Sequence, residues 1–317
     1  MRVLVTGGAG GIGSHLVEAL LARGDSVWVL DSFHDFYPRE RKERNLAVAR
    51  QHAGFAKLFE GDIRDRELVQ KSLREASPEV VVHLAARAGV RPSVEHAVDY
   101  TEVNLLGTAV VLEQVTALPG TRLVFASSST VYGDGATTPF EEDGDTSQPV
   151  SPYGASKRGG ELLCHAAHRA HALDVTCLRF FSAYGPRQRP DLAIAQWAER
   201  MVAGQSIPVF GDGSVERDFT YISDIVDGVV RAVDRPLGFA VYNLGRGQPF
   251  AMNRVIELLE RELGVPARRE TRPAHPADLP RTWASIERAR RDLGYTPAVS
   301  LEQGIQQYVR WLRAELA

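Results

Sequence analysis

A tyrosine and a lysine stand four residues apart in the segment Tyr153-Gly-Ala-Ser-Lys157. At this spacing two side chains share one face of a helix, so the phenol and the ammonium can reach the same site. A nearby cation favours the phenolate and is expected to lower the pKa of the tyrosine, which makes Tyr153 a candidate general base. The alternative is an ordinary surface pair. The chain has only four lysines, however, and hydroxyl side chains at residues 127–130 lie just upstream.

A glycine-rich turn follows the first apolar run of the chain. The segment Val-Thr-Gly7-Gly-Ala-Gly10-Gly-Ile-Gly13 has the order strand, turn, helix start, which brings backbone N–H groups and the positive end of a helix against a pyrophosphate. Asp31 ends the next strand, where its carboxylate would accept hydrogen bonds from both ribose hydroxyls and repel a 2′-phosphate. The alternative is a tight turn beside a helix-capping aspartate. We predict an NAD site formed by Gly7, Gly10, Gly11, Ile12, Gly13 and Asp31.

Two further strand ends are expected to join that site. Asp62 and Ile63 follow the third predicted strand, and Leu84, Ala85 and Ala86 follow the fourth. Ligands of parallel sheets bind at the carboxyl ends of the strands, so these residues are predicted to contact the cofactor.

The elements that position these residues alternate between short apolar runs and amphipathic stretches, which is typical of a parallel sheet with crossover helices. We therefore predict an α/β fold, a Rossmann-like doubly wound parallel sheet with a smaller C-terminal substrate-binding lobe. The predicted strands are 3–6, 26–30, 56–60, 80–84, 122–127, 174–180 and 240–244, and the predicted helices are 12–23, 66–75, 97–117, 152–172 and 222–232. Residues 1–180, with 215–245 returning to them, are predicted to bind NAD, and 181–214 with 246–317 to form the lobe.

Composition excludes several classes of protein. With 44% hydrophobic and 24% charged residues, a disordered chain is excluded, and a net charge of −3 provides no field for nucleic acid or an anionic membrane. Cys164 and Cys177 indicate free thiols, and the chain shows no signal-peptide pattern or bilayer-length apolar run, so we predict a cytoplasmic protein. His165, His168 and His171 are spread too widely on a helix for one metal ion, so no metal site is predicted.

Together with Arg217-Asp-Phe-Thr-Tyr-Ile222 and Leu293-Gly-Tyr-x-Pro297, these motifs resemble, over nearly the whole chain, the extended short-chain dehydrogenase family of sugar-nucleotide epimerases and dehydratases. The resemblance implies bound NAD, a UDP-sugar substrate, and a homodimer built on helices 97–117 and 152–172. It also implies roles for site residues. Ser128 or Thr130 would bind the sugar O4, Tyr153 would be the base and Lys157 would hold the nicotinamide ribose. Arg217, Asp278 and Arg281 would bind UDP.

Two segments bear on the reaction within this family. The dehydratases carry Asp-Glu at the places of Ser129 and Thr130, and the decarboxylases carry Glu at the second, whereas epimerisation needs neither carboxylate. Arg189 and Ser182, with Ala88-Gly-Val-Arg91, resemble the members that epimerise UDP-glucuronate at C4. Ser182 in place of threonine and Arg87 in place of glutamine depart from that pattern. We predict that Arg87, Arg91, Ser182 and Arg189 bind substrate. A neutral UDP-hexose 4-epimerase and a non-catalytic NAD-binding protein are the alternatives.

Overall fold

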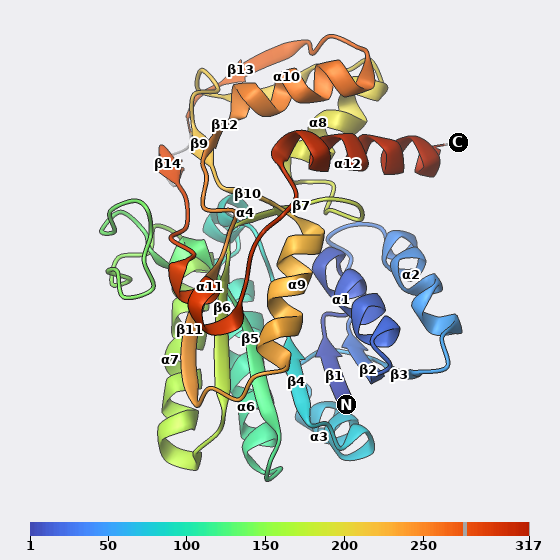
Figure 1. The fold of residues 1–317 in the computed structure, drawn as a ribbon, viewed down its shortest axis with the longest axis vertical. Coiled ribbons are helices and arrows are strands. Elements are labelled where there is room, and N and C mark those ends of the chain that lie inside the picture. Colours follow the sequence, from blue (N-terminus) through green and yellow to red (C-terminus); the bar gives the residue numbers. More distant parts are fainter. Residues whose placement is uncertain (275–277, 317) are drawn as a thin grey trace.

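A seven-stranded parallel sheet forms the centre of the protein in a computed structural model, which describes residues 1–274 and 278–316 (Figure 1). The strand order is β11-β6-β5-β4-β1-β2-β3, and every pair is parallel. The chain thus winds in one direction from β1 to β3 and in the other from β4 onward, as a doubly wound sheet requires. The strands are β1 (Arg2–Thr6), β2 (Ser26–Asp31), β3 (Phe55–Glu60), β4 (Val80–His83), β5 (Arg122–Ser128), β6 (Val175–Phe180) and β11 (Phe239–Leu244).

Alternation along the strands divides the core into two layers. In β1, Val3 and Val5 join the cluster that contains α1 (Gly11–Ala22) and α9 (Ile222–Val233), whereas Leu4 joins the cluster on the opposite face. That second face is covered by α3 (Arg66–Ala76), α6 (Gly107–Thr116) and α7 (Pro152–His171). Successive side chains of a strand point to opposite faces, so an apolar run such as Val-Leu-Val supplies both cores at once.

The predicted strands and most of the predicted helices are confirmed, with ends shifted by one or two residues. One prediction was wrong in detail. The helix expected at 97–117 consists of α5 (Ala97–Thr101), a π-helical turn η2 (Glu102–Leu106) and α6. The turn carries Asn104 inward, where its amide donates to the Arg87 carbonyl oxygen and to Ser156 Oγ, both at 2.9 Å. A short helix α4 (Val90–Glu95) was not predicted.

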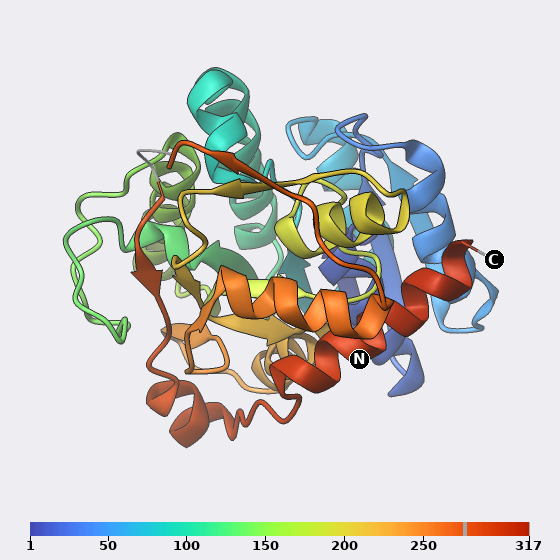
Figure 2. The ribbon, with the colours of Figure 1, turned by 90° about the horizontal axis from the view of Figure 1, so that it is seen from above.

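A second lobe lies above the carboxyl ends of the sheet strands (Figures 1 and 2). In its small sheets β7 pairs with β10, β9 pairs with both β12 and β14, and β13 pairs with β8. These strands are β7 (Ser182–Tyr184), β8 (Ile207–Phe210), β9 (Glu216–Arg217), β10 (Phe219–Tyr221), β12 (Phe250–Ala251), β13 (Arg269–Arg272) and β14 (Arg281–Thr282). The remaining helices are α2 (Arg39–Ala47), α8 (Ala193–Val202), α10 (Met252–Leu263), α11 (Glu287–Leu293) and α12 (Leu301–Leu316), with short 3-10 turns η1 (Ala49–Gln51) and η3 (Ser129–Val131).

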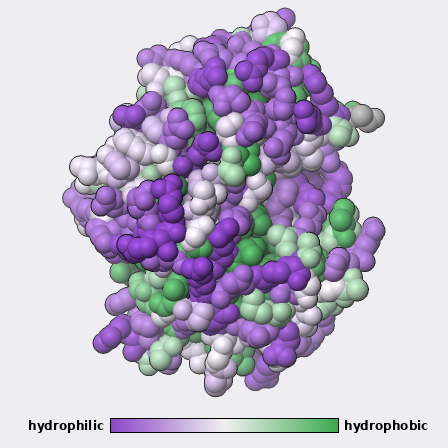
Figure 3. Space-filling model, viewed as in Figure 1, coloured by the Kyte–Doolittle hydropathy of each residue, from purple (hydrophilic) through white to green (hydrophobic). Residues whose placement is uncertain are grey.

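The chain crosses between the two parts more than once. After β10 it returns to the main sheet, where α9 packs against α1 and β11 pairs with β6, and it then leaves again for the lobe. No helix among the described residues is long and apolar enough to cross a membrane. The face shown in Figure 3 is mostly hydrophilic.

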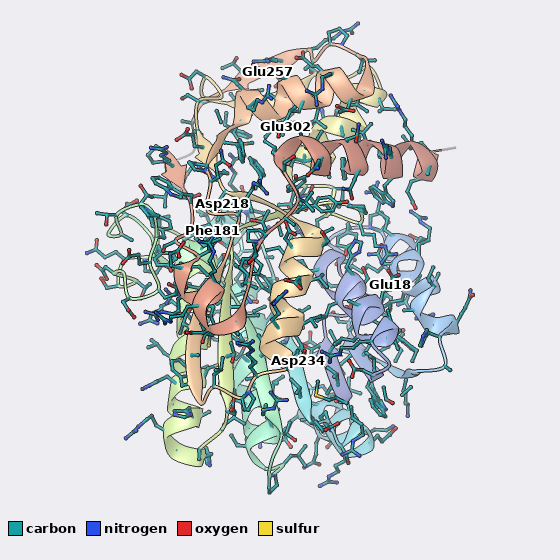
Figure 4. All side chains as sticks on the ribbon, viewed as in Figure 1. Glu18, Phe181, Asp218, Asp234, Glu257 and Glu302 are labelled. Carbon is teal, nitrogen blue, oxygen red and sulfur yellow. The ribbon has the colours of Figure 1, made fainter. Side chains whose placement is uncertain are left out.

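Asp218 joins segments of both parts. It lies between the main sheet and the upper lobe, near Phe181 (Figure 4), and its side chain is fully buried. The carboxylate accepts hydrogen bonds from Arg246 N at 2.7 Å, Gly247 N at 2.9 Å, Ala284 N at 3.1 Å and Thr220 Oγ1 at 3.1 Å. Only a carboxylate, with two acceptor oxygens and no proton of its own to place, satisfies all four donors.

We therefore expect Asp218→Asn to destabilise the protein. Either orientation of the amide turns an NH₂ group toward backbone N–H groups, and each unsatisfied buried donor costs about 1–3 kcal/mol. Urea unfolding should show a loss of roughly 2–4 kcal/mol. The exposed Asp134 provides a matched control, because Asp134→Asn should change stability by less than about 0.5 kcal/mol. Equal stability of the two variants would contradict the role given to Asp218.

Candidate active site

A large cleft lies between the carboxyl ends of the main strands and the second lobe, with a volume of about 1280 Å³. Its walls bring together nearly every residue that the sequence singled out. From the predicted cofactor group these are Gly7, Gly10, Gly11, Ile12, Gly13, Asp31, Asp62, Ile63, Leu84, Ala85 and Ala86, and from the other groups Arg87, Arg91, Ser128, Thr130, Tyr153, Lys157, Ser182, Arg189, Arg217 and Asp278.

Arg281, predicted to bind UDP, is the exception, because the structure does not place it in the wall of the cleft. Its side chain is half exposed and pairs with Glu216 instead of lining the cleft. The reason is the alternation of β14, which turns the neighbouring Thr282 into the cleft and Arg281 away from it.

The glycine turn is held against two other segments. Gly7 has a φ of +73°, and a Cβ there would lie 2.7 Å from the backbone nitrogen of Ala85 at the end of β4. A Cβ on Gly13 would lie 2.1 Å from the carbonyl oxygen of Gly7. The glycines are therefore required by the packing of β1, α1 and β4, and this packing leaves the N-terminus of α1 open toward the cleft.

Asp31 closes the far side of this turn. Its two carboxylate oxygens accept hydrogen bonds from Ala9 N and Phe33 N, both at 2.9 Å. Burial raises the pKa of Asp31, and these two N–H groups together with the charge of Lys42 oppose the rise. Because each oxygen has a second lone pair, the carboxylate can still accept hydrogen bonds from hydroxyl groups in the cleft.

The tyrosine and lysine lie at the start of α7. Ser151 caps this helix by accepting a hydrogen bond from Gly154 N at 3.1 Å, and Pro152 occupies the first turn, where its missing N–H costs nothing. Lys157 is almost fully buried and donates to the carbonyl oxygen of Ala126 in β5 at 2.7 Å. Ser128, two residues further along the chain, accepts from Thr130 Oγ1 at 3.0 Å.

The expected effect of Lys157 on Tyr153 is not what the structure shows. The pKa of Tyr153 is raised, because burial of the phenol outweighs the opposing effects of the Ser128 hydroxyl and the Arg189 charge. Burial also lowers the pKa of Lys157 to about 8. With its ammonium directed at the Ala126 carbonyl, Lys157 does not offset the desolvation of the phenol.

Arg189 lines the same cleft as Tyr153 and Lys157. Arg189 and Asp191 are two residues apart in the chain, a spacing that allows a simple surface ion pair. The pair is present, with Nε to Oδ1 at 3.0 Å and Nη2 to Oδ2 at 2.6 Å, but the arginine side chain is only 18% exposed and lines the cleft. Ser182, in β7, lies in the same wall.

The remaining arginines occupy other parts of the cleft. Arg87 pairs with Asp99 at 2.7 Å, and both residues line the cleft. Arg91 pairs with Asp278 across the cleft at 2.6 Å and stacks 3.5 Å above the Phe210 ring. Arg217 donates to the carbonyl oxygen of Leu279 at 2.7 Å.

Sequence reasoning missed several lining residues. Phe36 is 44% exposed, and its ring lies 4.7 Å from the Arg189 guanidinium. Tyr37 and Phe210 also line the cleft. The signal that could have found two of them is the run of aromatic residues after Asp31, which includes Phe36 and Tyr37. The histidines behave as packing residues, since His165 and His168 lie against Phe239. Among the described residues no group of three or more potential ligands could hold a metal ion.

A doubly wound parallel sheet with a glycine turn after β1, an acidic residue after β2 and a Tyr-Lys helix beside a serine-rich strand end defines a dinucleotide-binding α/β protein with a catalytic apparatus. Comparison with known proteins agrees. The model of the NAD dependent epimerase/dehydratase family matches residues 3–245, and the chain belongs to this family.

Two of the similar proteins are UDP-glucuronate 4-epimerases. A UDP-glucuronate 4-epimerase of Thermodesulfobacterium geofontis is 38% identical over 314 residues, covering 99% of this chain and 96% of the relative. The crystal structure of UDP-glucuronic acid 4-epimerase from Bacillus cereus, in complex with UDP-glucuronic acid and NAD, is 34% identical with a TM-score of 0.93, covering 99% of this chain and 100% of that one. A UDP-glucose 4-epimerase from Thermotoga maritima with UDP-glucose is also similar, at 31% identity and a TM-score of 0.91, with both chains fully covered.

Burial of the Lys157 ammonium predicts a characteristic dependence of stability on pH. Its pKa falls from 10.5 to about 8 on folding, so between these values the unfolded chain binds more protons and stability rises with pH. Lys157→Met removes the titrating ammonium and with it this contribution to the pH dependence of stability. In protein freed of nucleotide, the stability advantage of the variant over wild type should be on the order of 3 kcal/mol below pH 8 and shrink toward pH 10.5.

Urea unfolding at several pH values would measure this difference. Lys57→Met, which removes a half-exposed ammonium paired with Glu75, serves as the control and should follow the wild-type slope. A constant difference between Lys157→Met and wild type across this range would show that the Lys157 ammonium is not penalised by burial.

Proposed function

We propose that the protein is an NAD-dependent 4-epimerase of a UDP-uronic acid, interconverting UDP-glucuronate and UDP-galacturonate through a transient 4-keto sugar. The observation that carries this proposal is the meeting of three groups in one part of the cleft. The Tyr153 ring packs edge-on against Tyr100 with 6.2 Å between ring centres, and the Tyr100 hydroxyl and Arg189 Nη1 both donate to the Ala88 carbonyl oxygen. Ser128, Tyr153 and Arg189 line the same cleft, so a base for a sugar hydroxyl and a cation for a sugar carboxylate lie in one part of it. The similar proteins of T. geofontis and B. cereus, both UDP-glucuronate 4-epimerases, support the same assignment.

The cleft also fits the cofactor. The open N-terminus of α1 offers N–H groups to a pyrophosphate, and Asp31 offers carboxylate oxygens to ribose hydroxyls. Asp62 and Ile63 after β3, and Leu84 to Ala86 after β4, line the same end. When bound, NAD supplies the acceptor and the donor of the hydride exchanged at C4. Lys157, at the inner end of this wall, would hold the nicotinamide ribose.

The remaining catalytic tasks belong to side chains of this protein. Tyr153 would take the proton from the C4 hydroxyl and return it, while Ser128, with Thr130 hydrogen-bonded to it, would bind the same oxygen. Ser129 and Thr130 bring no carboxylate to this strand end. The site therefore has no acid and base pair there for eliminating water, which favours simple epimerisation.

Arg189 and Ser182 would control the substrate's carboxylate. A 4-keto uronic acid is a β-keto acid, which loses CO₂ when its carboxylate stands perpendicular to the ketone. The planar fork of a guanidinium can fix the rotation of a carboxylate as well as its position. Arg217, Arg91 and Asp278, from three separate segments at the lobe side of the cleft, would hold the UDP portion.

The residues proposed to contact NAD all lie in the first part of the fold, whereas those proposed to contact the sugar nucleotide come from both parts. We propose that residues 1–180 and 215–245 bind the cofactor and that 181–214 and 246–317 bind the sugar nucleotide. We also propose a homodimer through α5, η2 and α7. Val98, Leu106 and Leu162 on these elements are each more than half exposed, which is unusual for large apolar side chains on one surface. Two buried free thiols support a cytoplasmic location.

The function can be tested by incubating the purified protein, without added cofactor, with UDP-glucuronate, UDP-galacturonate or UDP-glucose and identifying the products. We expect the two uronates to interconvert, and NAD to be released when the protein is denatured, because an epimerase regenerates its cofactor in each cycle. Conversion of UDP-glucose alone would establish the neutral-sugar epimerase, and bound NAD without any turnover would establish a non-catalytic protein.

Tyr153→Phe should reduce epimerisation by about 10²- to 10⁴-fold, the usual contribution of general acid–base catalysis, because the ring packing remains while the proton acceptor is lost. The rate of UDP-galacturonate formation measures this. The fully buried Tyr132, whose hydroxyl donates to Asn243 Oδ1 at 2.7 Å, is the matched control, and Tyr132→Phe should affect stability more than rate. A Tyr153→Phe enzyme within a few-fold of wild type would refute the assignment.

A further inference from the structure

Three groups contact the guanidinium of Arg189 in the cleft. Its guanidinium lies 4.7 Å from the centre of the Phe36 ring, and its Nη1 donates to the carbonyl oxygen of Ala88 at 2.8 Å. That carbonyl is fixed in turn, since it also accepts from the Tyr100 hydroxyl at 2.9 Å. The Phe36 ring packs against the face of the guanidinium, and the Ala88 carbonyl oxygen accepts a hydrogen bond from one of its nitrogens. Neither partner carries the negative charge that a mostly buried cation needs.

Asp191 supplies that charge. Its two oxygens bind Nε and Nη2 of Arg189 in the parallel arrangement that carboxylates form with a guanidinium fork. Among the described residues, Arg189 provides the only hydrogen bonds made by this carboxylate. Asp191 is 31% exposed and lies in the loop that precedes α8. Its carboxylate can therefore turn away into solvent, where water satisfies it, while Phe36 and Ala88 stay in place. The Nε and Nη2 donors that it releases then need another carboxylate.

The edge of the fork taken by Asp191 is the one suited to any other carboxylate. A uronate group arriving there would replace one carboxylate by another, with the same number of hydrogen bonds and the same charge. A neutral CH₂OH group has neither the charge nor the two acceptors, so it cannot replace Asp191 on equal terms.

We propose that Asp191 occupies the Arg189 fork while the site is empty and yields it to the substrate's carboxylate, while Phe36 and the Ala88 carbonyl keep the guanidinium in position. The exchange makes Asp191 a specificity-determining residue. It neutralises Arg189 between turnovers and keeps the fork closed to substrates without a carboxylate. This inference rests on the proposed function, because it requires an acidic sugar as the substrate.

Binding measurements in a catalytically disabled background test the exchange directly. We take the Tyr153→Phe holoenzyme as the parent and measure the Kd values of UDP-glucuronate and UDP-glucose by calorimetry. Asp191→Asn removes the competing charge, so the Kd of UDP-glucuronate should fall. A decrease of about 3- to 10-fold is expected, because the pair that is lost is neither fully exposed nor fully buried. The Kd of UDP-glucose should change by less than about two-fold, since this sugar does not take the fork.

Two further variants make the test specific. Asp99→Asn removes the same charge from another arginine of the cleft, Arg87, and should alter both Kd values by a similar factor. In an Arg189→Ala background, Asp191→Asn should no longer favour UDP-glucuronate, because there is no fork left to release.

Several results would overturn the proposal. Unchanged or weaker binding of UDP-glucuronate by Asp191→Asn would make Asp191 a fixed support of Arg189, and equal tightening of both sugars would reduce its effect to general charge. Failure of the proposed function is recognised separately, in the active wild-type enzyme, as a lack of UDP-glucuronate epimerisation.

Discussion

The buried ion pair between Glu161 of α7 and Arg179 of β6 is the interaction on which the geometry of the site depends. Glu161 Oε1 accepts from Arg179 Nε at 2.8 Å and from Ser127 Oγ at 2.6 Å, and Oε2 accepts from Arg179 Nη2 at 2.9 Å. Arg179 Nη1 donates to the Glu142 carbonyl oxygen at 3.0 Å. Breaking such a pair would leave a lone charge in the core at a cost of about 3–5 kcal/mol, so α7 has a single position relative to β5 and β6.

This constraint fixes the chemical groups because they lie within one or two turns of it. Lys157 is one helical turn before Glu161, and Ser128 directly follows Ser127 in the chain. The Lys157 ammonium bonded to the Ala126 carbonyl adds a second link between the same helix and strand. The first turn of α7 and the end of β5 are therefore held as one rigid unit. The second lobe faces this unit with side chains on loops, which is where a selective group such as Arg189, with its exchangeable partner Asp191, can be placed.

Much of the fold and of the site was predictable because the signals are local. A valine-rich run followed by glycines dictates a strand and a tight turn whatever the rest of the chain does, and parallel strands bring Asp31 and the Tyr153 helix to one edge of the sheet. The π-helical turn at residues 102–106 was not predictable. The apolar pattern of that stretch is helical throughout, and the extra residue in the turn serves contacts of Asn104 with Arg87 and Ser156, which lie far away in the sequence.

The sequence by itself determined the parallel sheet, the cofactor turn and the set of residues around the reacting groups, since residue type and spacing along the chain specify these. Only the tertiary structure decided which charges meet and how much water reaches them. Burial raises the pKa of Tyr153 despite a lysine one turn away, and the pleat of a two-residue strand directs Arg281 away from the cleft. Phe36 reaches Arg189 only when the loops after β2 and β7 have assembled, and only that assembly buries the local pair of Arg189 with Asp191. Desolvation and ion pairing depend on distances in space between segments, which no local pattern encodes.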